Sequence, residues 1–214
     1  MSPSTPLSAH RIPTLPESMY YIPNFISSAE ESALLDKIPP NRWTPLAHRR
    51  LQAHPTSLHQ GHTLLSLFAQ TPHQAPNHCL INEYLPGQGI MPHEDGPAYA
   101  PLVATISLGS ALVLDVYDKT EEGGRGERLG RVLCERGSLL VTEGEAYTAT
   151  LHGIEGCKVD GDLGPGTVAN WELLGDPEAF PDGKNERERR VSLTYRDVLR
   201  VAKIGAGILG VGRR

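Results

Sequence analysis

Three residues of metal-binding types stand in an informative spacing. His93 and Asp95 form a His-x-Asp pair in the segment NEYLPGQGIMPHEDGP, and His152 follows later in the strand-like run TLHGI. Residues two apart on an extended chain point to the same face, so His93 and Asp95 could bind one ion. Two histidines and one carboxylate make the facial triad of non-haem iron(II) sites, which leaves adjacent coordination positions open. We therefore predict His93, Asp95 and His152 as the ligands of a catalytic iron(II).

A second group of polar residues could hold an organic acid beside that metal. Arg190 and Arg196 are six residues apart in RRVSLTYR, and Asn82 and Tyr84 are two apart in CLINEYL, so each pair would share one face of a strand. 2-Oxoglutarate chelates iron(II) through its keto oxygen and the neighbouring carboxylate, which leaves its far carboxylate in need of a counter-ion. A guanidinium suits that carboxylate, because it binds at two points and keeps its charge. The sequence thus predicts 2-oxoglutarate as co-substrate, used together with O2.

Each of these residues, taken singly, also has a purely structural explanation. His93 could be a turn residue after Pro92, His152 a core histidine and Arg190 a surface charge. Their combination in this order, on strand-like runs, favours the metal site.

Other motif-like features do not predict a site. The run GAGILG at 205–210 has the glycine spacing of dinucleotide-binding loops. The chain after it is too short for the helix, strand and acidic residue that such a loop requires, so we expect a tail. The histidines from His48 to His78 lie in a stretch without periodicity, and we expect them in solvent-exposed loops.

The composition permits a globular enzyme without naming one. The 214 residues suit one domain, and the net charge of −5 gives no sign of an overall basic nucleic-acid binder. Residues 184–214, however, hold nine Lys or Arg against three Asp or Glu, and could meet phosphates or form a solvated face. The three cysteines have no CxxC spacing, which argues against a disulfide framework. With no signal-peptide or membrane-span pattern, we expect a protein of the cytoplasm or nucleus that does not bind membranes.

Short apolar runs between turn residues predict a mainly β (α+β) chain with a double-stranded β-helix, or jelly-roll, core and N-terminal helices on one side. We expect a flexible leader at 1–18, a domain at 19–203 and a flexible tail at 204–214. A helix should follow Ser28, with Glu31 completing a capping box, while 44–78 should be irregular apart from a helix near 64–70. The segments 118–130 and 155–185 should be surface loops. The expected strands are CLINEYL, LVATISL, ALVLDVY, LGRVLC, SLLVT, AYTATL and VSLTY.

With these motifs in order, the chain resembles the AlkB-like dioxygenases and, within them, the branch of eukaryotic AlkB homologue six. The resemblance runs from about Tyr20 to about Lys203 and rests on NEYLPGQGIMPHEDGPAYAPLVATISLGS, SLLVTEGEAYTATLHGI and RRVSLTYRDVLR. It implies oxidative removal of methyl groups from nitrogen, with formaldehyde, succinate and carbon dioxide as products. It also implies site residues: iron(II) at His93, Asp95 and His152, 2-oxoglutarate at Asn82, Tyr84, Arg190 and Ser192, and Arg196 as a second arginine near the site.

Two departures from the family concern the substrate. Where the founding bacterial repair enzyme has an acidic residue that helps to recognise the flipped base, this chain has Pro97, and the lid region at 52–76 is short. The leading hypothesis is a demethylase of methylated DNA or RNA. The alternatives are an oxygenase acting on a protein or small molecule, and a nucleic-acid-binding module with little turnover. The sequence does not predict the oligomeric state.

Overall fold

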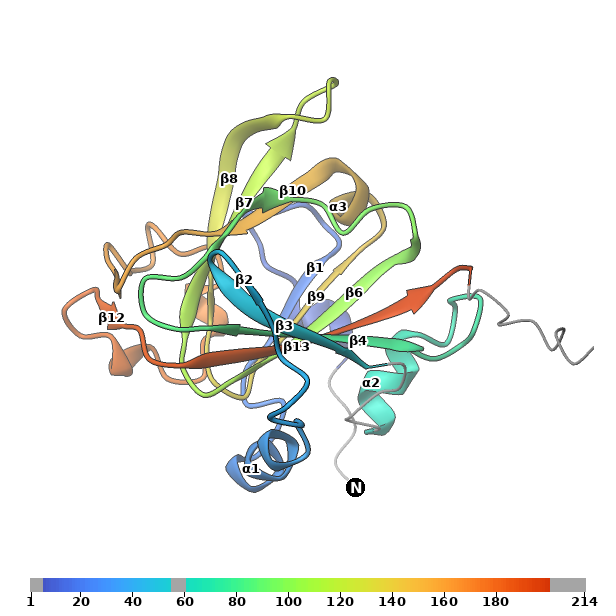
Figure 1. Ribbon diagram of the computed structural model, residues 1–214. Helices are drawn as coiled ribbons and strands as arrows, with labels where there is room; N and C mark the ends of the chain where they lie inside the picture. Colours follow the sequence, from blue (N-terminus) through green and yellow to red (C-terminus); the bar gives the residue numbers. More distant parts are fainter. Residues whose placement is uncertain (1–5, 55–60, 201–214) are drawn as a thin grey trace, which may run out of the picture.

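Two antiparallel β-sheets face each other, as the computed structural model shows (Figure 1). The structure describes residues 6–54 and 61–200. Apolar side chains from both sheets pack together between them, among them Tyr21 and Leu140 from the larger sheet and Val116 and Val132 from the smaller one. The predicted mainly β, jelly-roll architecture is confirmed. Among the described residues, no helix has both the length and the apolar character needed to cross a membrane.

The larger sheet has seven strands and the smaller sheet four. Across the larger sheet the order is β1 (Met19–Ile22), β9 (Leu139–Glu143), β6 (Tyr99–Leu108), β13 (Arg190–Val198), β4 (His78–Tyr84), β3 (Arg49–His54) and β2 (Thr44–Leu46). Across the smaller sheet it is β5 (Ile90–His93), β10 (Thr150–Ile154), β7 (Leu112–Lys119) and β8 (Arg125–Cys134). The remaining elements are α1 (Ser28–Asp36), α2 (His62–Leu67), α3 (Gly144–Ala149), the short pair β11 (Val159–Asp160) and β12 (Asn185–Glu186), and 3-10 turns at Leu7–His10, Trp171–Leu173 and Pro177–Ala179.

Strand β13 is buried on both faces because it lies in the middle of the larger sheet, between β6 and β4. Its residues alternate between two environments. Val191, Leu193 and Tyr195 pack in the cluster that also holds Leu34 of α1 and Leu64 of α2, so these helices cover the outer face of the sheet. The polar residues between them face the interior, where the candidate site lies.

The capping box of α1 lies one residue earlier than predicted. The sequence holds the same spacing twice, as Ser27–Glu30 and Ser28–Glu31. In the structure the first pair caps the helix: the Ser27 side chain accepts from the Glu30 amide at 3.3 Å, and the Glu30 carboxylate accepts from the Ser27 amide at 2.8 Å. Glu31 is instead buried and pairs with Arg136 from the turn before β9. Tertiary contact, which local spacing does not encode, selects between the two registers.

Two predictions of local structure were wrong. Residues 44–54, which were predicted to be irregular, instead form β2 and β3, a hairpin that extends the larger sheet beside β4. The run AYTATL is not one strand: Gly144, at φ +54°, ends β9 and begins α3, and the extended chain resumes only at Thr150. Burial of Ala146 and Tyr147 accounts for the apolar pattern that resembled a strand.

The segments predicted as surface loops or a leader are largely structural. Most of 118–130 belongs to the β7–β8 hairpin. The stretch 155–185 covers the outer face of the smaller sheet, where Leu163, Val168 and Phe180 are buried. The predicted leader at 1–18 extends too far, because Ile12 and Leu15 are buried between the sheets. The predicted tail at 204–214 lies outside the described residues.

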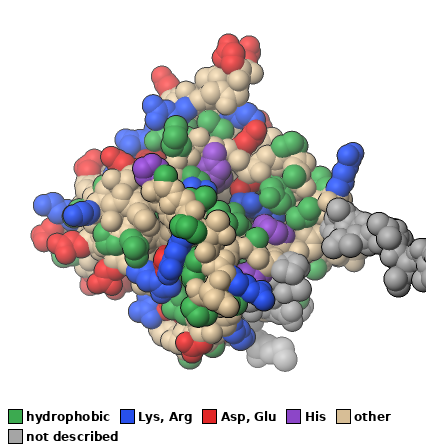
Figure 2. Space-filling view, in the orientation of Figure 1, with side chains coloured by type: hydrophobic (Ala, Val, Ile, Leu, Met, Phe, Trp, Pro, Cys, Tyr) green, Lys and Arg blue, Asp and Glu red, His purple; other side chains and the backbone are tan. Residues whose placement is uncertain are grey.

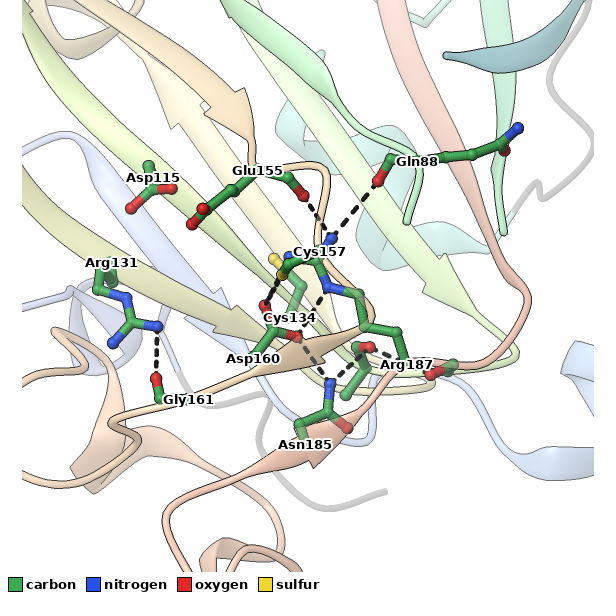
Figure 3. A network of polar contacts seen from close by, with 12 residues as sticks. Gln88, Asp115, Arg131, Cys134, Glu155, Cys157, Asp160, Gly161, Asn185 and Arg187 are labelled. Carbon is green, nitrogen blue, oxygen red and sulfur yellow. Dashed lines mark hydrogen bonds and ion pairs between the residues drawn. The ribbon is translucent and has the colours of Figure 1, made fainter. Parts of the chain in front are cut away.

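Arg187 ties this covering segment to the smaller sheet (Figure 3). Its guanidinium pairs with Asp160 at 2.5 and 3.0 Å, and the side chains of both residues are almost fully buried. It also donates to the carbonyl oxygen of Glu155 at 2.6 Å and to that of Gln88 at 3.5 Å. Gln88 precedes β5 and Glu155 follows β10, so one arginine holds the ends of both strands together.

Candidate metal and co-substrate site

The three predicted metal ligands lie together at the edge of the smaller sheet. His93 ends β5 and stands directly opposite His152 on β10, with ring centroids 4.5 Å apart. Asp95 follows two residues after β5. The potential ligand atoms of the three residues all lie within 4.8 Å of one another, and they are the one such group found among the described residues.

Close contact of two backbones brings the two histidines together. A Cβ on Gly89 would lie 2.2 Å from the carbonyl oxygen of Ile154, and one on Gly153 would lie 3.0 Å from the backbone of Pro92. A side chain at either position would push β5 away from β10. Gly89, just before β5, and Gly153, just after His152, therefore allow the two strands to approach closely. The sequence did not predict this role.

Both histidines can offer a ring nitrogen to a metal. Nδ1 of His93 lies 2.9 Å from the carbonyl oxygen of Met91. Because a carbonyl only accepts, Nδ1 donates the hydrogen bond, and Nε2 is the ring nitrogen left to bind a metal. Burial lowers the pKa of His152 to about 4, so the ring of His152 is neutral near pH 7. Two imidazoles and one carboxylate are a donor set that fits iron(II).

Arg196 lies at the same site and pairs with Asp95. Its guanidinium also lies 4.7 Å from the ring centre of Tyr99. The sequence predicted Arg196 as a co-substrate residue. In the structure it contacts a predicted metal ligand, which makes it a link between the two predicted groups.

Arg190 is a buried cation without a carboxylate partner among the described residues. It is 4% exposed, and among the described residues its Nη2 donates a hydrogen bond to the Ser107 hydroxyl at 2.9 Å. Its Nε has no hydrogen-bond partner among the residues that the structure describes. Burial lowers the pKa of Arg190, which reflects the cost of placing a charge in this environment. A buried guanidinium in this state fits the carboxylate of a bound acid.

The other predicted co-substrate residues surround Arg190 by strand register. In the antiparallel pair of β13 with β4, Arg190 lies opposite Tyr84 and Ser192 lies opposite Asn82. Directly opposite residues share a face of the sheet, so all four point into the same space. All eight predicted site residues line one cavity of about 100 Å³: Asn82, Tyr84, His93, Asp95, His152, Arg190, Ser192 and Arg196.

Sequence reasoning missed several residues of this cavity. Arg49 and Thr194 line it, and the Ser107 hydroxyl accepts a hydrogen bond from Arg190. Thr194 could have been found, because it stands midway between Ser192 and Arg196 on the same face of the predicted strand. Arg49 could not, since its segment was expected to be irregular.

The histidines from His48 to His78 are not uniformly loop residues in solvent, as predicted. His54 is buried and hydrogen-bonds to Gln52 at 3.0 Å, and His73 binds the buried Asp197 at 2.5 Å. His48 is exposed, as predicted, whereas GAGILG lies outside the described residues.

Comparison with known proteins agrees with this geometry. The family model described as 2OG-Fe(II) oxygenase superfamily matches residues 35–196. A zebrafish (Danio rerio) protein named "Probable RNA/DNA demethylase ALKBH6" is 36% identical over 92% of each chain. The mouse (Mus musculus) protein named "tRNA (carboxymethyluridine(34)-5-O)-methyltransferase ALKBH8" is 29% identical over 87% of this chain and 31% of its own. The solved structure of OsALKBH1 has the same fold, with a TM-score of 0.54 at 15% identity, covering 86% of this chain and 99% of that one.

Proposed function

The chain belongs to the 2OG-Fe(II) oxygenase superfamily, in its AlkB-like branch, and from that premise we propose that it is an oxidative N-demethylase of nucleic acid. As a member it is an enzyme that uses iron(II) and 2-oxoglutarate. We assign the iron to His93, Asp95 and His152. We assign 2-oxoglutarate to Arg190, with Asn82, Tyr84 and Ser192 beside it and Arg196 close to the metal.

One observation carries the site assignment. A three-residue donor set, with ligand atoms within 4.8 Å of one another, shares a cavity with a buried arginine that no carboxylate of the described residues neutralises. The first group fits a metal that keeps open positions, and the second fits the far carboxylate of its chelating acid. When bound, iron and 2-oxoglutarate supply oxidation of a C–H bond by O2.

The chain's own residues bind and orient the reactants. The carbonyl of Met91 keeps the proton on Nδ1 of His93, which directs the other ring nitrogen to the metal. Arg196 holds the Asp95 carboxylate on the inner face of the larger sheet. Arg187 keeps the ends of β5 and β10 together and so maintains the spacing of the two histidines.

The substrate proposal is supported by two relatives. One is named a probable demethylase of RNA and DNA, and the other is named for an activity on tRNA. A methylated base could reach the cavity from a single strand or after flipping out of a duplex. Such a substrate would place the protein in the nucleus or cytoplasm, which microscopy of the tagged protein would test.

The deciding experiment measures succinate release from 2-oxoglutarate by iron-loaded protein, with and without a panel of N-methylated DNA and RNA oligonucleotides. We expect one modified oligonucleotide to accelerate release, with formaldehyde formed in step. Slow succinate release that no oligonucleotide accelerates would be consistent with oxygenase activity but would refute the proposed nucleic-acid substrate. The search would then turn to proteins and small molecules.

A further inference from the structure

Two adjacent arginines on β3 point in opposite directions. Pairing with β4 sets Arg50 opposite Glu83 and Leu51 opposite Asn82. Because successive residues alternate between the two faces of a sheet, Arg49 shares the face of Leu51 and Asn82, while Arg50 shares that of Glu83. Arg49 accordingly lines the iron cavity, and Arg50 does not.

The charge of Arg50 is neutralised on the outer face. Its guanidinium pairs with Glu83 through two nitrogens, and Glu83 also accepts from Arg189 at 2.5 Å. The guanidinium lies 4.6 Å from the ring centre of Trp43 as well. The charge of Arg50 is therefore satisfied by contacts outside the cavity.

The charge of Arg49 has no such partner. Its Nε donates to Asn82 Oδ1 at 3.2 Å, and no carboxylate within the described part of the chain lies at ion-pair distance from it. The other two arginines of the cavity are accounted for, since Arg196 pairs with Asp95 and Arg190 is assigned to 2-oxoglutarate. Arg49 is the third cation of the cavity and is half-buried.

Arg49 is also the most exposed of the three cavity arginines, because Arg190 and Arg196 are only 4% and 7% exposed while Arg49 is partly exposed. The hairpin turn just before it is exposed, and the carbonyl oxygen of His48 accepts from the amide of Gly89 at 3.2 Å, beside β5. Figure 2 shows basic side chains over the β2–β3 hairpin on this face.

We propose that Arg49 binds the phosphodiester adjacent to the nucleotide whose methylated base enters the cavity. This inference rests on the proposed function and assigns a residue to substrate positioning. A guanidinium at the boundary of a cavity binds phosphate oxygens at two points. Contacts to phosphates fix the register of a nucleic acid without reading its sequence, so such a contact would place the base over the iron.

The test compares Arg49→Gln with wild type. Glutamine removes the charge and retains a donor for Asn82. Arg49→Lys retains the charge but loses the two-point geometry of the guanidinium. The matched control is Arg50→Gln, which changes the neighbouring arginine on the outer face. The probes are one methylated single-stranded oligonucleotide and two versions with a neutral methylphosphonate, placed 5′ or 3′ of the methylated nucleotide. Affinity is measured without oxygen, with iron(II) and 2-oxoglutarate bound, at several salt concentrations.

We expect Arg49→Gln to weaken binding of the normal oligonucleotide by about tenfold, the loss typical of one charge-assisted contact. The magnitude of the slope of log affinity against log salt concentration should fall by about 1, the value for one lost phosphate contact. One methylphosphonate should weaken wild type by about the same factor and leave Arg49→Gln unaffected. The affinity for 2-oxoglutarate should not change, and Arg50→Gln should show the same methylphosphonate effect as wild type.

Four results would overturn the proposal, and the last of them would overturn the proposed function as well. Equal losses of Arg49→Gln on all three probes would show that the residue acts through the fold. A weakened affinity for 2-oxoglutarate with unchanged oligonucleotide binding would assign Arg49 to the co-substrate. If wild type binds and demethylates the oligonucleotide and Arg49→Gln does so equally well, this inference alone fails; if wild type neither binds nor demethylates any oligonucleotide, the proposed function fails with it.

Discussion

Asp95 and Arg196 form an ion pair whose side chains are only 3% and 8% exposed. The proposed metal ligand thus has a second, structural partner on β13. His93 differs from Asp95 in this respect, because within residues 6–54 and 61–200 its Nδ1 bonds only to a backbone carbonyl of its own strand.

We expect both His93→Ala and Asp95→Ala to abolish iron-dependent succinate formation. Their effects on the metal-free protein should differ. Asp95→Ala leaves Arg196 buried without its carboxylate and should lower the free energy of unfolding by about 3 kcal/mol, as for other broken buried pairs. His93→Ala should cost clearly less. Urea unfolding measures both, and the double variant Asp95→Ala/Arg196→Met should recover much of the loss. Full activity in either single variant would refute the iron assignment.

Arg190→Met should separate stability from binding. Removing a buried cation that lacks a carboxylate partner should raise the free energy of unfolding of the unliganded protein by about 1 kcal/mol or more. The affinity for 2-oxoglutarate should fall by at least about tenfold, because a charge-assisted contact is lost. Calorimetric titration and urea unfolding are the measurements. An unchanged co-substrate dissociation constant would refute the role of Arg190.

Asp160→Asn tests whether Arg187 organises the metal strands. The variant leaves Arg187 buried beside a neutral amide and should cost about 3 kcal/mol of unfolding free energy. Because Arg187 also binds the carbonyls next to β5 and β10, iron affinity should fall although no ligand is changed. Iron binding is measured at a temperature where the variant is fully folded. A stability loss with unchanged iron affinity would limit this pair to the covering segment.

The stability of the metal-free protein should depend on pH through His152. Its pKa is lowered by burial to about 4 in the folded state and is about 6.5 in the unfolded chain. As pH falls below 6.5 the unfolded chain gains a proton that the folded protein does not take up until about pH 4. The contribution is therefore present above pH 6.5 and is lost through this window, at up to about 1.4 kcal/mol per pH unit. His152→Gln should flatten the stability profile between pH 6.5 and 5 relative to wild type, and parallel profiles would contradict the assignment.

Glu31→Ala should destabilise the protein more than Glu30→Ala does. Glu31 is buried, pairs with Arg136 and accepts from the amide of Gly109 at 2.6 Å. Its loss should cost about 2–3 kcal/mol, against about 1 kcal/mol for a capping residue. Chemical denaturation of the two variants gives the comparison, and the reverse order would contradict the buried ion-pair role of Glu31.

The sequence by itself determined the residue types and local geometry of the site. The His-x-Asp pair, the six-residue spacing of Arg190 and Arg196, and the alternation in CLINEYL are short-range patterns, and strand geometry alone makes each pair share a face. The β-rich architecture followed from similar local signals. These predictions needed no knowledge of which strand lies beside which.

Tertiary structure decided everything that depends on pairing between distant segments. That His152 faces His93, that Arg196 meets Asp95, and that Ser27 rather than Ser28 caps α1 are set by registers and burial across more than one element. The same holds for Arg49 and Arg50, which are neighbours of one type in the sequence and are separated by the register of β3 on β4. A shift of one residue would exchange their faces, and only the packing of the whole sheet selects the register.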